Sequence, residues 1–211
     1  RDLTLSGSVV GKNSVGLLCG FLIYQALCSN VVIHADVRGE STVAALIGNA
    51  DGALVFGCRI YGRVAGTQRV GGANGYTHQN SRFEDNLSAA TVVRLASSTE
   101  QTFGSFVGYS RNSTFRRNYA LGPVHYEGAA DPLNRGFCGT KAGGLLPASV
   151  DENNFFDMET TGQSSSAGNA TGKTTAEMRD IATYTDLRTL GLGRVLAGTA
   201  SADASGTTVT G

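Results

Sequence analysis

A short glycine-flanked phrase recurs along this chain and constrains its fold more than any other feature. The phrase occurs at Val15–Gly20, Val43–Gly48, Val70–Gly75 and Phe103–Gly108, and more loosely at Phe137–Gly139. Its leading apolar residues are 28, 27, 33 and 34 positions apart. A repeat of this length indicates one structural unit stacked on itself rather than a domain built around a single unrepeated core.

Each repeat continues into a segment of alternating polarity, and Asn30–Gly39 shows the pattern best. One face of this segment is apolar and the other is polar, which predicts a half-buried strand. The apolar face consists of Val31, Ile33, Ala35 and Val37. Short strands, frequent glycines and the repeat length predict an all-β fold, a single-stranded β-solenoid (β-helix) of about five coils with a short C-terminal helix. These patterns do not fix the hand of the solenoid, and we expect right-handed coils. We expect coils about 4.8 Å apart, with glycine at corners where a Cβ atom would clash.

Two departures from the repeat have structural consequences. Extra residues in the third and fourth repeats, at Val93–Gln101 and Pro123–Arg135, predict loops on one side of the stack. Asp2–Gly11 resembles the second half of a repeat, so we expect the sequence to open in the middle of a coil with an unpaired strand edge. Such an edge is a template for pairing with another chain.

The composition changes after Asp157, and this divides the chain into three parts. The predicted parts are a solenoid at residues 1–158, a loop and capping helix at 159–194, and a tail rich in Ala, Ser, Gly and Thr at 195–211. The tail lacks the apolar mass to order itself, so we expect it to be flexible or to donate a strand to a partner.

The middle part contains one clear helix start. Thr160–Gly172 is rich in Ser, Thr and Gly and predicts a loop. Thr174 followed by Glu177 forms a capping box ahead of a short helix near residues 175–183. We expect Met178 and Ile181, the apolar residues of this helix, to close the end of the solenoid.

The repeated phrases resemble the GLUG motif, a repeat of bacterial surface and secreted proteins. The resemblance rests on the four complete phrases and on the run from Asn153 to Met178, and it covers roughly residues 3–185. It implies a β-solenoid with an adhesive or structural role, and it supplies no catalytic residues. The fifth repeat departs most from the pattern, because Lys141–Val150 is inserted there.

The charge balance excludes some classes of partner. The 17 basic and 17 acidic residues give a net charge of zero at pH 7, whereas nucleic acids and anionic membranes favour a basic surface. Zero net charge also removes long-range repulsion between copies of the chain. No run approaches the roughly 18 consecutive apolar residues of a membrane span. We therefore expect neither a nucleic-acid partner nor a membrane span.

Residues capable of catalysis do not gather into a recognisable pattern. Asp36, Asp51, Glu84 and Asp85 are spread over three repeats, and the adjacent Glu84 and Asp85 should point to opposite faces of a strand. Gly168–Thr174 lacks the first glycine of a phosphate-binding loop. The histidines do not have metal-ligand spacing; they are His34, His78 and His125. We therefore expect no enzymatic activity, cofactor or metal.

The cysteines leave two interpretations open. Cys19, Cys28, Cys58 and Cys138 contain neither a CxxC pair nor metal-ligand spacing. They are either buried thiols at repeat positions or include at least one disulfide. Cys19 and Cys138 occupy similar points in distant repeats, so we do not expect them to pair with each other.

Arginine and tyrosine recur along the middle repeats, and both residue types are favoured at interfaces. They form either a solvated outer face or a lateral surface that binds protein or sugar. The candidate interface residues are Tyr61, Arg63, Arg82, Tyr109, Arg111, Arg116, Arg117 and Tyr119.

These features favour a non-enzymatic extracellular structural protein, secreted or at the cell surface. Its copies would assemble into a fibre or surface layer by head-to-tail stacking or strand donation. The alternative is an adhesin module that binds a glycan or a host cell-surface protein through the Pro123–Arg135 region. A polysaccharide-cleaving enzyme is a third hypothesis, and it would need carboxylates aligned in one groove.

Overall fold

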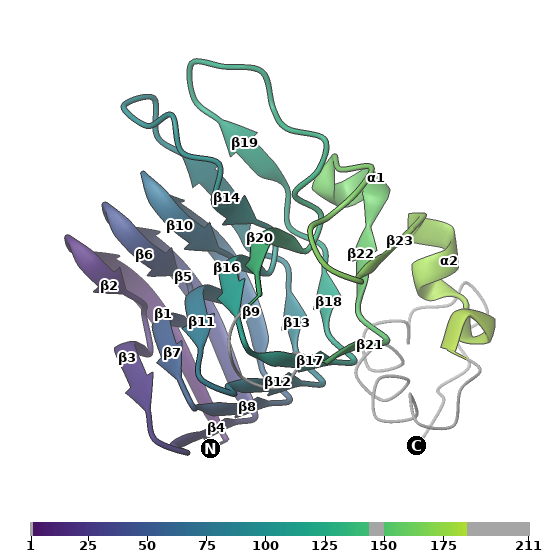
Figure 1. Cartoon of the computed structure of the whole chain (residues 1–211), viewed down its shortest axis with the longest axis horizontal. Coiled ribbons are helices and arrows are strands. Elements are labelled where there is room, and N and C mark those ends of the chain that lie inside the picture. Colours follow the sequence, from purple (N-terminus) through teal and green to yellow (C-terminus); the bar gives the residue numbers. More distant parts are fainter. Residues whose placement is uncertain (1, 144–149, 185–211) are drawn as a thin grey trace.

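Strands of successive repeats pair in parallel and in register, as the solenoid prediction requires. The structure is a computed structural model that describes residues 2–143 and 150–184. In it Leu3 pairs with Val31, and Val32 pairs with Arg59. Four parallel sheets result, and each coil passes through them in turn (Figure 1). The predicted all-β solenoid of about five coils is confirmed.

The first two sheets, called A and B here, follow one another in every complete coil. Sheet A consists of β1 (Leu3–Val10), β5 (Val31–Arg38), β9 (Arg59–Gly66), β13 (Leu87–Ser88), β14 (Thr91–Arg94), β18 (Tyr119–Ala120), β19 (Val124–Tyr126), β22 (Phe155–Asp157) and β23 (Thr171–Lys173). Sheet B consists of β2 (Asn13–Val15), β6 (Ser41–Ala44), β10 (Gln68–Gly71) and β15 (Phe103–Gly104).

Sheets C and D complete the coil. Sheet C consists of β3 (Cys19–Ile23), β7 (Ile47–Asp51), β11 (Asn74–His78), β16 (Val107–Arg111) and β20 (Cys138–Ala142). Sheet D consists of β4 (Leu27–Ser29), β8 (Leu54–Phe56), β12 (Arg82–Glu84), β17 (Thr114–Arg116) and β21 (Asp151–Glu152). Coil 1 is β1–β4, coil 2 is β5–β8, coil 3 is β9–β12, coil 4 is β13–β17 and coil 5 is β18–β21.

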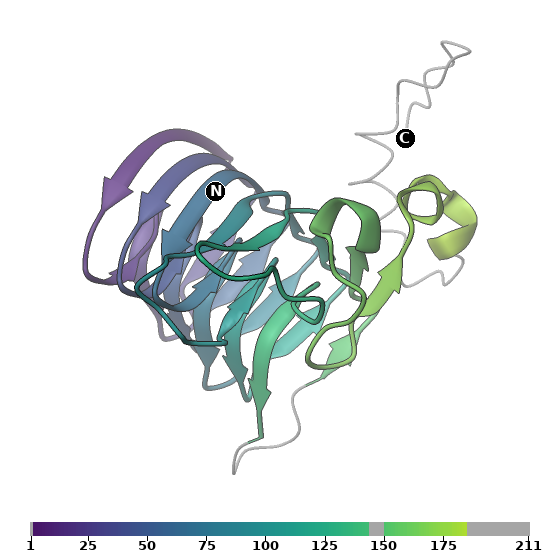
Figure 2. The same cartoon turned by 90° about the horizontal axis from the view of Figure 1, so that it is seen from above.

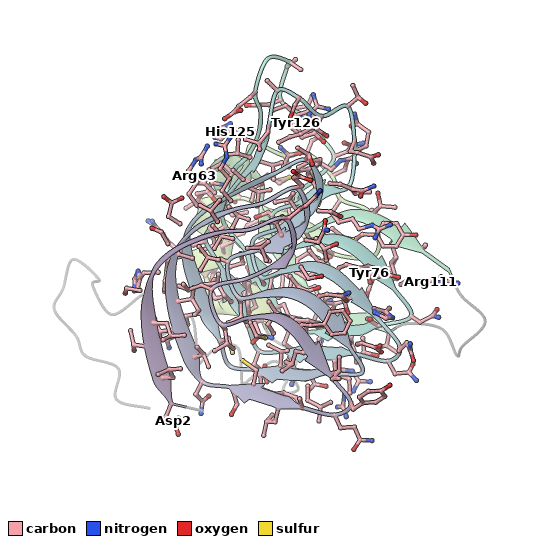
Figure 3. The ribbon with its side chains drawn as sticks, turned by 90° about the vertical axis from the view of Figure 1, so that its left-hand side faces the viewer. Asp2, Arg63, Tyr76, Arg111, His125 and Tyr126 are labelled. Carbon is pink, nitrogen blue, oxygen red and sulfur yellow. The ribbon has the colours of Figure 1, made fainter. Side chains whose placement is uncertain are left out.

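The solenoid is right-handed, as predicted. Figure 3 looks along the stack from the coil 1 end, and the chain turns clockwise as it recedes from the viewer. The burial of β5 alternates as the polarity pattern predicts, because Val31, Ile33 and Val37 are buried while His34 and Asp36 are exposed.

Residues in the left-handed backbone region turn the chain between sheets. The corner between sheets D and A holds one such residue per coil, with φ between 52° and 62°. These residues are Asn30, Gly57, Asp85, Arg117 and Asn153. Glycine and asparagine suit this conformation, whereas arginine adopts it at an energetic cost.

The last glycine of the repeated phrase lies where two backbones meet. A Cβ atom on Gly48 would come within 2.6 Å of the Val15 backbone nitrogen, and one on Gly108 would come equally close to that of Val70. No side chain fits at such distances, which explains why the phrase ends in glycine in successive repeats.

The interior combines apolar columns with a polar one. Phe83 stacks on Phe115, and Phe106 stacks on Phe137, with ring centroids 5.3 and 4.7 Å apart. The polar column is a ladder of Asn86, Asn118 and Asn154, each no more than 1% exposed. Each side chain donates to the next, from Asn86 Nδ2 to Asn118 Oδ1 and from Asn118 Nδ2 to Asn154 Oδ1, both at 2.9 Å. The sequence patterns did not predict this ladder.

The two ends of the stack differ (Figure 2). At coil 1, Leu3 points inward yet is 41% exposed, whereas Val31, its partner in coil 2, is 2% exposed. At the other end, Met158, Ala167 and Ala170 pack against the interior. The segment around residues 163–170 also hydrogen-bonds the last coil, for example through Gly136 N to Ser165 O at 2.9 Å. Among the residues that the structure describes, coil 1 is therefore the end whose interior is uncovered.

The C-terminal part contains more structure than the predicted loop. Residues Met158–Thr161 form helix α1, and β23 adds a further strand to sheet A. The predicted capping box at Thr174 is present, and it begins helix α2 (Thr175–Arg179), which is followed by a 3-10 turn at Ile181–Tyr184.

The expectation that Met178 closes the end of the solenoid is wrong. Met178 packs with Tyr184 onto an outward-facing column of sheet A formed by Leu87, Tyr119 and Phe155. Because these outward side chains are apolar, exposing them to water would be unfavourable, and α2 shields them. The side chain of Ile181 and the predicted tail at 195–211 lie outside what the structure describes.

The long loops lie as predicted. The segment after β14 and the segment after β19 both project from the same side of the stack, at the top of Figure 1. Two contacts tie the second loop to β19: His125 Nδ1 lies 2.8 Å from Asp131 Oδ2, and Tyr126 N donates to Asp131 Oδ1 at 2.7 Å. Burial acts to raise the pKa of Asp131, but the hydrogen bonds with His125 and Tyr126 N together outweigh it, so the pKa lies below its ordinary value.

Candidate binding surfaces

The corner between sheets C and D contains a groove of about 470 Å³. Its lining combines one aromatic ring with amide and charged side chains. Residues from coils 1, 2 and 3 contribute, among them Tyr24, Gln25, Asp51, Gly52, Gln79 and Asn80. Leu54 and Arg82 lie on its sheet D side.

Sheet C, beside this groove, carries a cluster of planar side chains on its outer face. Tyr76 stacks on His78 with ring centroids 4.8 Å apart, and its neighbour in the next coil is Tyr109, at 5.3 Å. The Arg69 guanidinium lies 5.1 Å from the Tyr76 centroid and 5.6 Å from that of Tyr109. Such cation–π contacts hold the rings in place.

The surroundings of His78 shift its pKa below the ordinary value. Burial lowers its pKa, nearby Asp51 opposes this, and Arg111 lowers the pKa further. His78 Nε2 lies 3.9 Å from Asp51 Oδ2. The outer face of sheet C therefore presents an electrically mixed surface, with Arg111 exposed on coil 4.

The predicted interface residues do not form one surface. Tyr61 and Arg63 lie on sheet A, whereas Tyr109 and Arg111 lie on sheet C. Figure 3 shows Arg63 and Arg111 on opposite sides of the coil. Tyr119 is fully buried under α2, so it is not available to a partner. Its strand pattern correctly indicated an outward position, but the helix that covers it comes from a distant part of the sequence.

The remaining predicted residues, Arg82, Arg116 and Arg117, are engaged within the molecule. All three reach Glu84, with nitrogen to oxygen distances of 2.6, 3.9 and 3.3 Å. Arg116 also pairs with Glu152 at 3.1 Å. This cluster links coils 3, 4 and 5 and leaves these arginines less free to anchor a partner.

The expectation that Glu84 and Asp85 point to opposite faces is wrong. Arg117 binds both carboxylates, because Asp85 has a φ of 58° and leaves the strand at the corner. The alternation rule holds only within a strand. Both carboxylates are held by arginine, which does not favour either as a general acid.

The other candidate residues stay apart. His34 stacks on Tyr61 on the outer face of sheet A, with centroids 5.1 Å apart, and His125 lies in β19, just before the second long loop. Among residues 2–143 and 150–184, no group of three His, Cys, Asp or Glu side chains is placed to hold a metal ion.

The four cysteines are free thiols in the structure. Cys28 and Cys58 lie in neighbouring coils with their sulfur atoms 3.7 Å apart, well beyond the roughly 2.05 Å of a disulfide bond. The contact with Cys58, together with burial, raises the pKa of Cys28. Burial raises the pKa of Cys138 to about 12.

Comparison with known proteins finds a partial relative and no family. No family model matches the chain, and no solved structure matches it. A glycine-rich membrane protein of Evansella cellulosilytica is 35% identical over 107 residues, which cover 51% of this chain and 12% of that protein. Within the part of the chain that the structure describes, no helix is long and apolar enough to cross a membrane.

Proposed function

We propose that this protein is a non-enzymatic structural β-solenoid of the cell surface or extracellular space, built from GLUG-type repeats, whose copies associate through coil 1. The observation that carries the proposal is the contrast between the two ends. The inward side chains of coil 1, among them Leu5, Val9 and Leu22, are only partly buried, whereas coil 2 buries its inward residues.

A second coil placed on this end would hydrogen-bond the open edge of β1 and bury the inward side chains of coil 1. Among the described residues, β1 pairs only with β5, so its outer backbone edge is open to hydrogen bonding. The stacked coil would also cover the inward side chains, and full burial of a Leu side chain stabilises by about 1.5–3 kcal/mol. Two copies related by a two-fold axis can bring their coil 1 ends together.

Growth beyond a pair requires a second contact. Head-to-tail stacking would have to displace Met158 and Ala167, which cover the far end of the interior. We therefore propose that the segment 195–211, which lies outside the described residues, makes the second contact by strand donation. The relative named as a membrane protein supports the cell-surface placement.

A lysine introduced on either face of β1 tests the coil 1 contact. Leu5→Lys places a charge on the inward face of β1, whereas Ser6→Lys places the same charge on its outward face. Sedimentation equilibrium over a wide concentration range should show that the original chain and the Ser6→Lys control associate, while Leu5→Lys stays monomeric. A monomeric original chain, or an unaffected Leu5→Lys variant, would refute the proposal.

Negative-stain electron microscopy tests the second contact. The original chain should form filaments or sheets, and deletion of Leu196–Gly211 should leave pairs. Undiminished assembly of the shortened chain would exclude the tail as the second contact without affecting the coil 1 contact.

A further inference from the structure

The groove between sheets C and D exists because one residue in its wall has no side chain. Tyr24, Gly52 and Gln79 occupy the same corner position in coils 1, 2 and 3, next to the paired residues Ile23, Asp51 and His78. All three have left-handed backbones, with φ of 50°, 64° and 51°. The missing side chain at Gly52 opens the space between the Tyr24 and Gln79 side chains, which stand two coils, or about 10 Å, apart.

Tyr24 is placed as a platform. Its side chain is 83% exposed, the most among the large exposed hydrophobic residues of the described chain. A left-handed backbone costs a bulky residue free energy, and this conformation recurs at the same corner in the following coils, so it belongs to the turn. Glycine serves at the same position in coil 2, so the corner itself does not require a tyrosine.

Planar polar groups share the groove with this ring. Gln79 Nε2 donates to Asp51 Oδ2 at 3.4 Å, which links two of the lining side chains. The side-chain amides of Gln25 and Asn80 line the groove and form no hydrogen bond with other described residues. Amides offer both donors and acceptors, which suits ligands rich in hydroxyl groups.

One charged side chain of the groove is compensated and the other is not. Arg82 Nη2 donates to Glu84 at 2.6 Å, whereas Asp51 lies 3.9 Å from His78 Nε2 and accepts from the uncharged amide of Gln79. The lining therefore presents one carboxylate acceptor and no unpaired cation, which disfavours an acidic ligand. An exposed aromatic ring suits the apolar face of a neutral sugar, and amides and a carboxylate suit its hydroxyls.

We propose that the groove around Gly52 binds a neutral polysaccharide, with one pyranose ring seated on Tyr24 and its hydroxyls bonded by Asp51, Gln79 and Asn80. The groove runs across three coils, so it accommodates a short stretch of a longer chain. The groove takes Tyr24 and Gln25 from coil 1 and its other lining residues from coils 2 and 3. It also differs from the Pro123–Arg135 region that the sequence indicated.

Substitutions at Gly52 and Tyr24 test the proposal and leave the corner geometry intact. Gly52→Asn fills the groove, because asparagine tolerates the left-handed region and a Cβ atom there would lie 3.4 Å from the nearest atom, Gln79 O. Tyr24→Asn removes the ring without adding backbone strain, and Tyr24→Phe keeps it. The matched control is Asn112→Gly, the same corner position in coil 4, outside the groove.

The probes are immobilised neutral polysaccharides (cellulose, chitin, xylan, mannan, galactan and β-1,3-glucan) beside acidic alginate and polygalacturonate. The original chain should bind at least one neutral probe, and its soluble oligosaccharide should be bound with the same preference in calorimetry. Gly52→Asn and Tyr24→Asn should weaken this binding about tenfold or more, the loss expected for one aromatic contact. Tyr24→Phe and Asn112→Gly should bind like the original.

Three outcomes overturn the proposal. They are binding to no neutral probe at millimolar oligosaccharide concentration, binding to the acidic probes alone, and equal binding by Gly52→Asn and the original chain. Circular dichroism and thermal unfolding of each variant confirm that the solenoid is intact, so loss of binding is attributable to the groove.

Discussion

Arg117 binds Asp85 in the neighbouring coil through two parallel hydrogen bonds, Nε to Oδ1 at 2.7 Å and Nη2 to Oδ2 at 3.0 Å. Both residues occupy the left-handed corner between sheets D and A. The hydrogen bond to Asp85 raises the pKa of Arg117 above its ordinary value, with Glu84 adding to the effect. The pair thus compensates for the backbone cost of a non-glycine corner.

Asp85→Asn tests the contribution of this ion pair. Asparagine keeps the shape and suits the left-handed backbone, but it loses the charge and one acceptor. We expect the free energy of unfolding to fall by about 1–2 kcal/mol, because hydrogen bonds to charged groups are the stronger class. Urea denaturation measures the change. Glu127→Gln is the control, since the exposed Arg63–Glu127 pair should contribute close to zero; equal effects would contradict the assignment.

Asn118→Ala should be among the most destabilising single substitutions. Asn118 Oδ1 accepts from Asn86 N and Nδ2, and its own Nδ2 donates to Phe83 O and Asn154 Oδ1. Truncation leaves these buried groups without partners, and each unsatisfied group lowers the free energy of unfolding by about 1–3 kcal/mol. The midpoint of thermal unfolding should therefore fall sharply. Asn134→Ala, at an exposed position, should unfold like the original chain. A small effect of Asn118→Ala would mean that water replaces the amide.

The fold was predictable because the same phrase recurs at each coil. Gly48 and its equivalents are required where the backbones of two coils meet, so they mark that contact in the sequence. The alternating polarity of Val31–Arg38 indicates a strand with one buried face. The asparagine ladder was not predicted, because a polar residue in a strand pattern indicates an outward position. Asn86, Asn118 and Asn154 are 32 and 36 positions apart, close to the repeat length, and this spacing was the available signal.

The candidate site was less predictable than the fold. The groove depends on which corner residues align in neighbouring coils, and Tyr24, Gly52 and Gln79 share no sequence phrase. Tyr119 was misjudged because its cover, α2, lies more than 50 positions along the chain. Repeat patterns fix the register of strands, whereas corner alignment and covering segments depend on tertiary packing.

The pKa of His78 should respond in opposite directions to its two charged neighbours. Burial and Arg111 lower this pKa, and Asp51 raises it. Arg111→Gln should therefore raise the pKa of His78, and Asp51→Asn should lower it further; NMR titration of the imidazole measures both. Since the folded-state pKa lies below the ordinary 6.5, His78 contributes stability that is present above pH 6.5 and lost as the pH falls through the folded-state pKa. Shifts of the same sign in both variants would refute the arrangement.

Met178→Ala tests whether α2 covers sheet A as a packed element. Met178 is 4% exposed and packs with Leu87, Tyr119 and Phe155. We expect a loss of about 2–4 kcal/mol from the local packing, as for other buried Met→Ala changes. Because α2 is short and lies at one end, the loss should appear as faster hydrogen exchange in residues 171–184 while β5 and β9 stay protected. Arg179→Ala, at an exposed position of the same helix, should leave exchange unchanged; uniform loss of protection throughout the stack would show instead that the helix and the solenoid unfold as one unit.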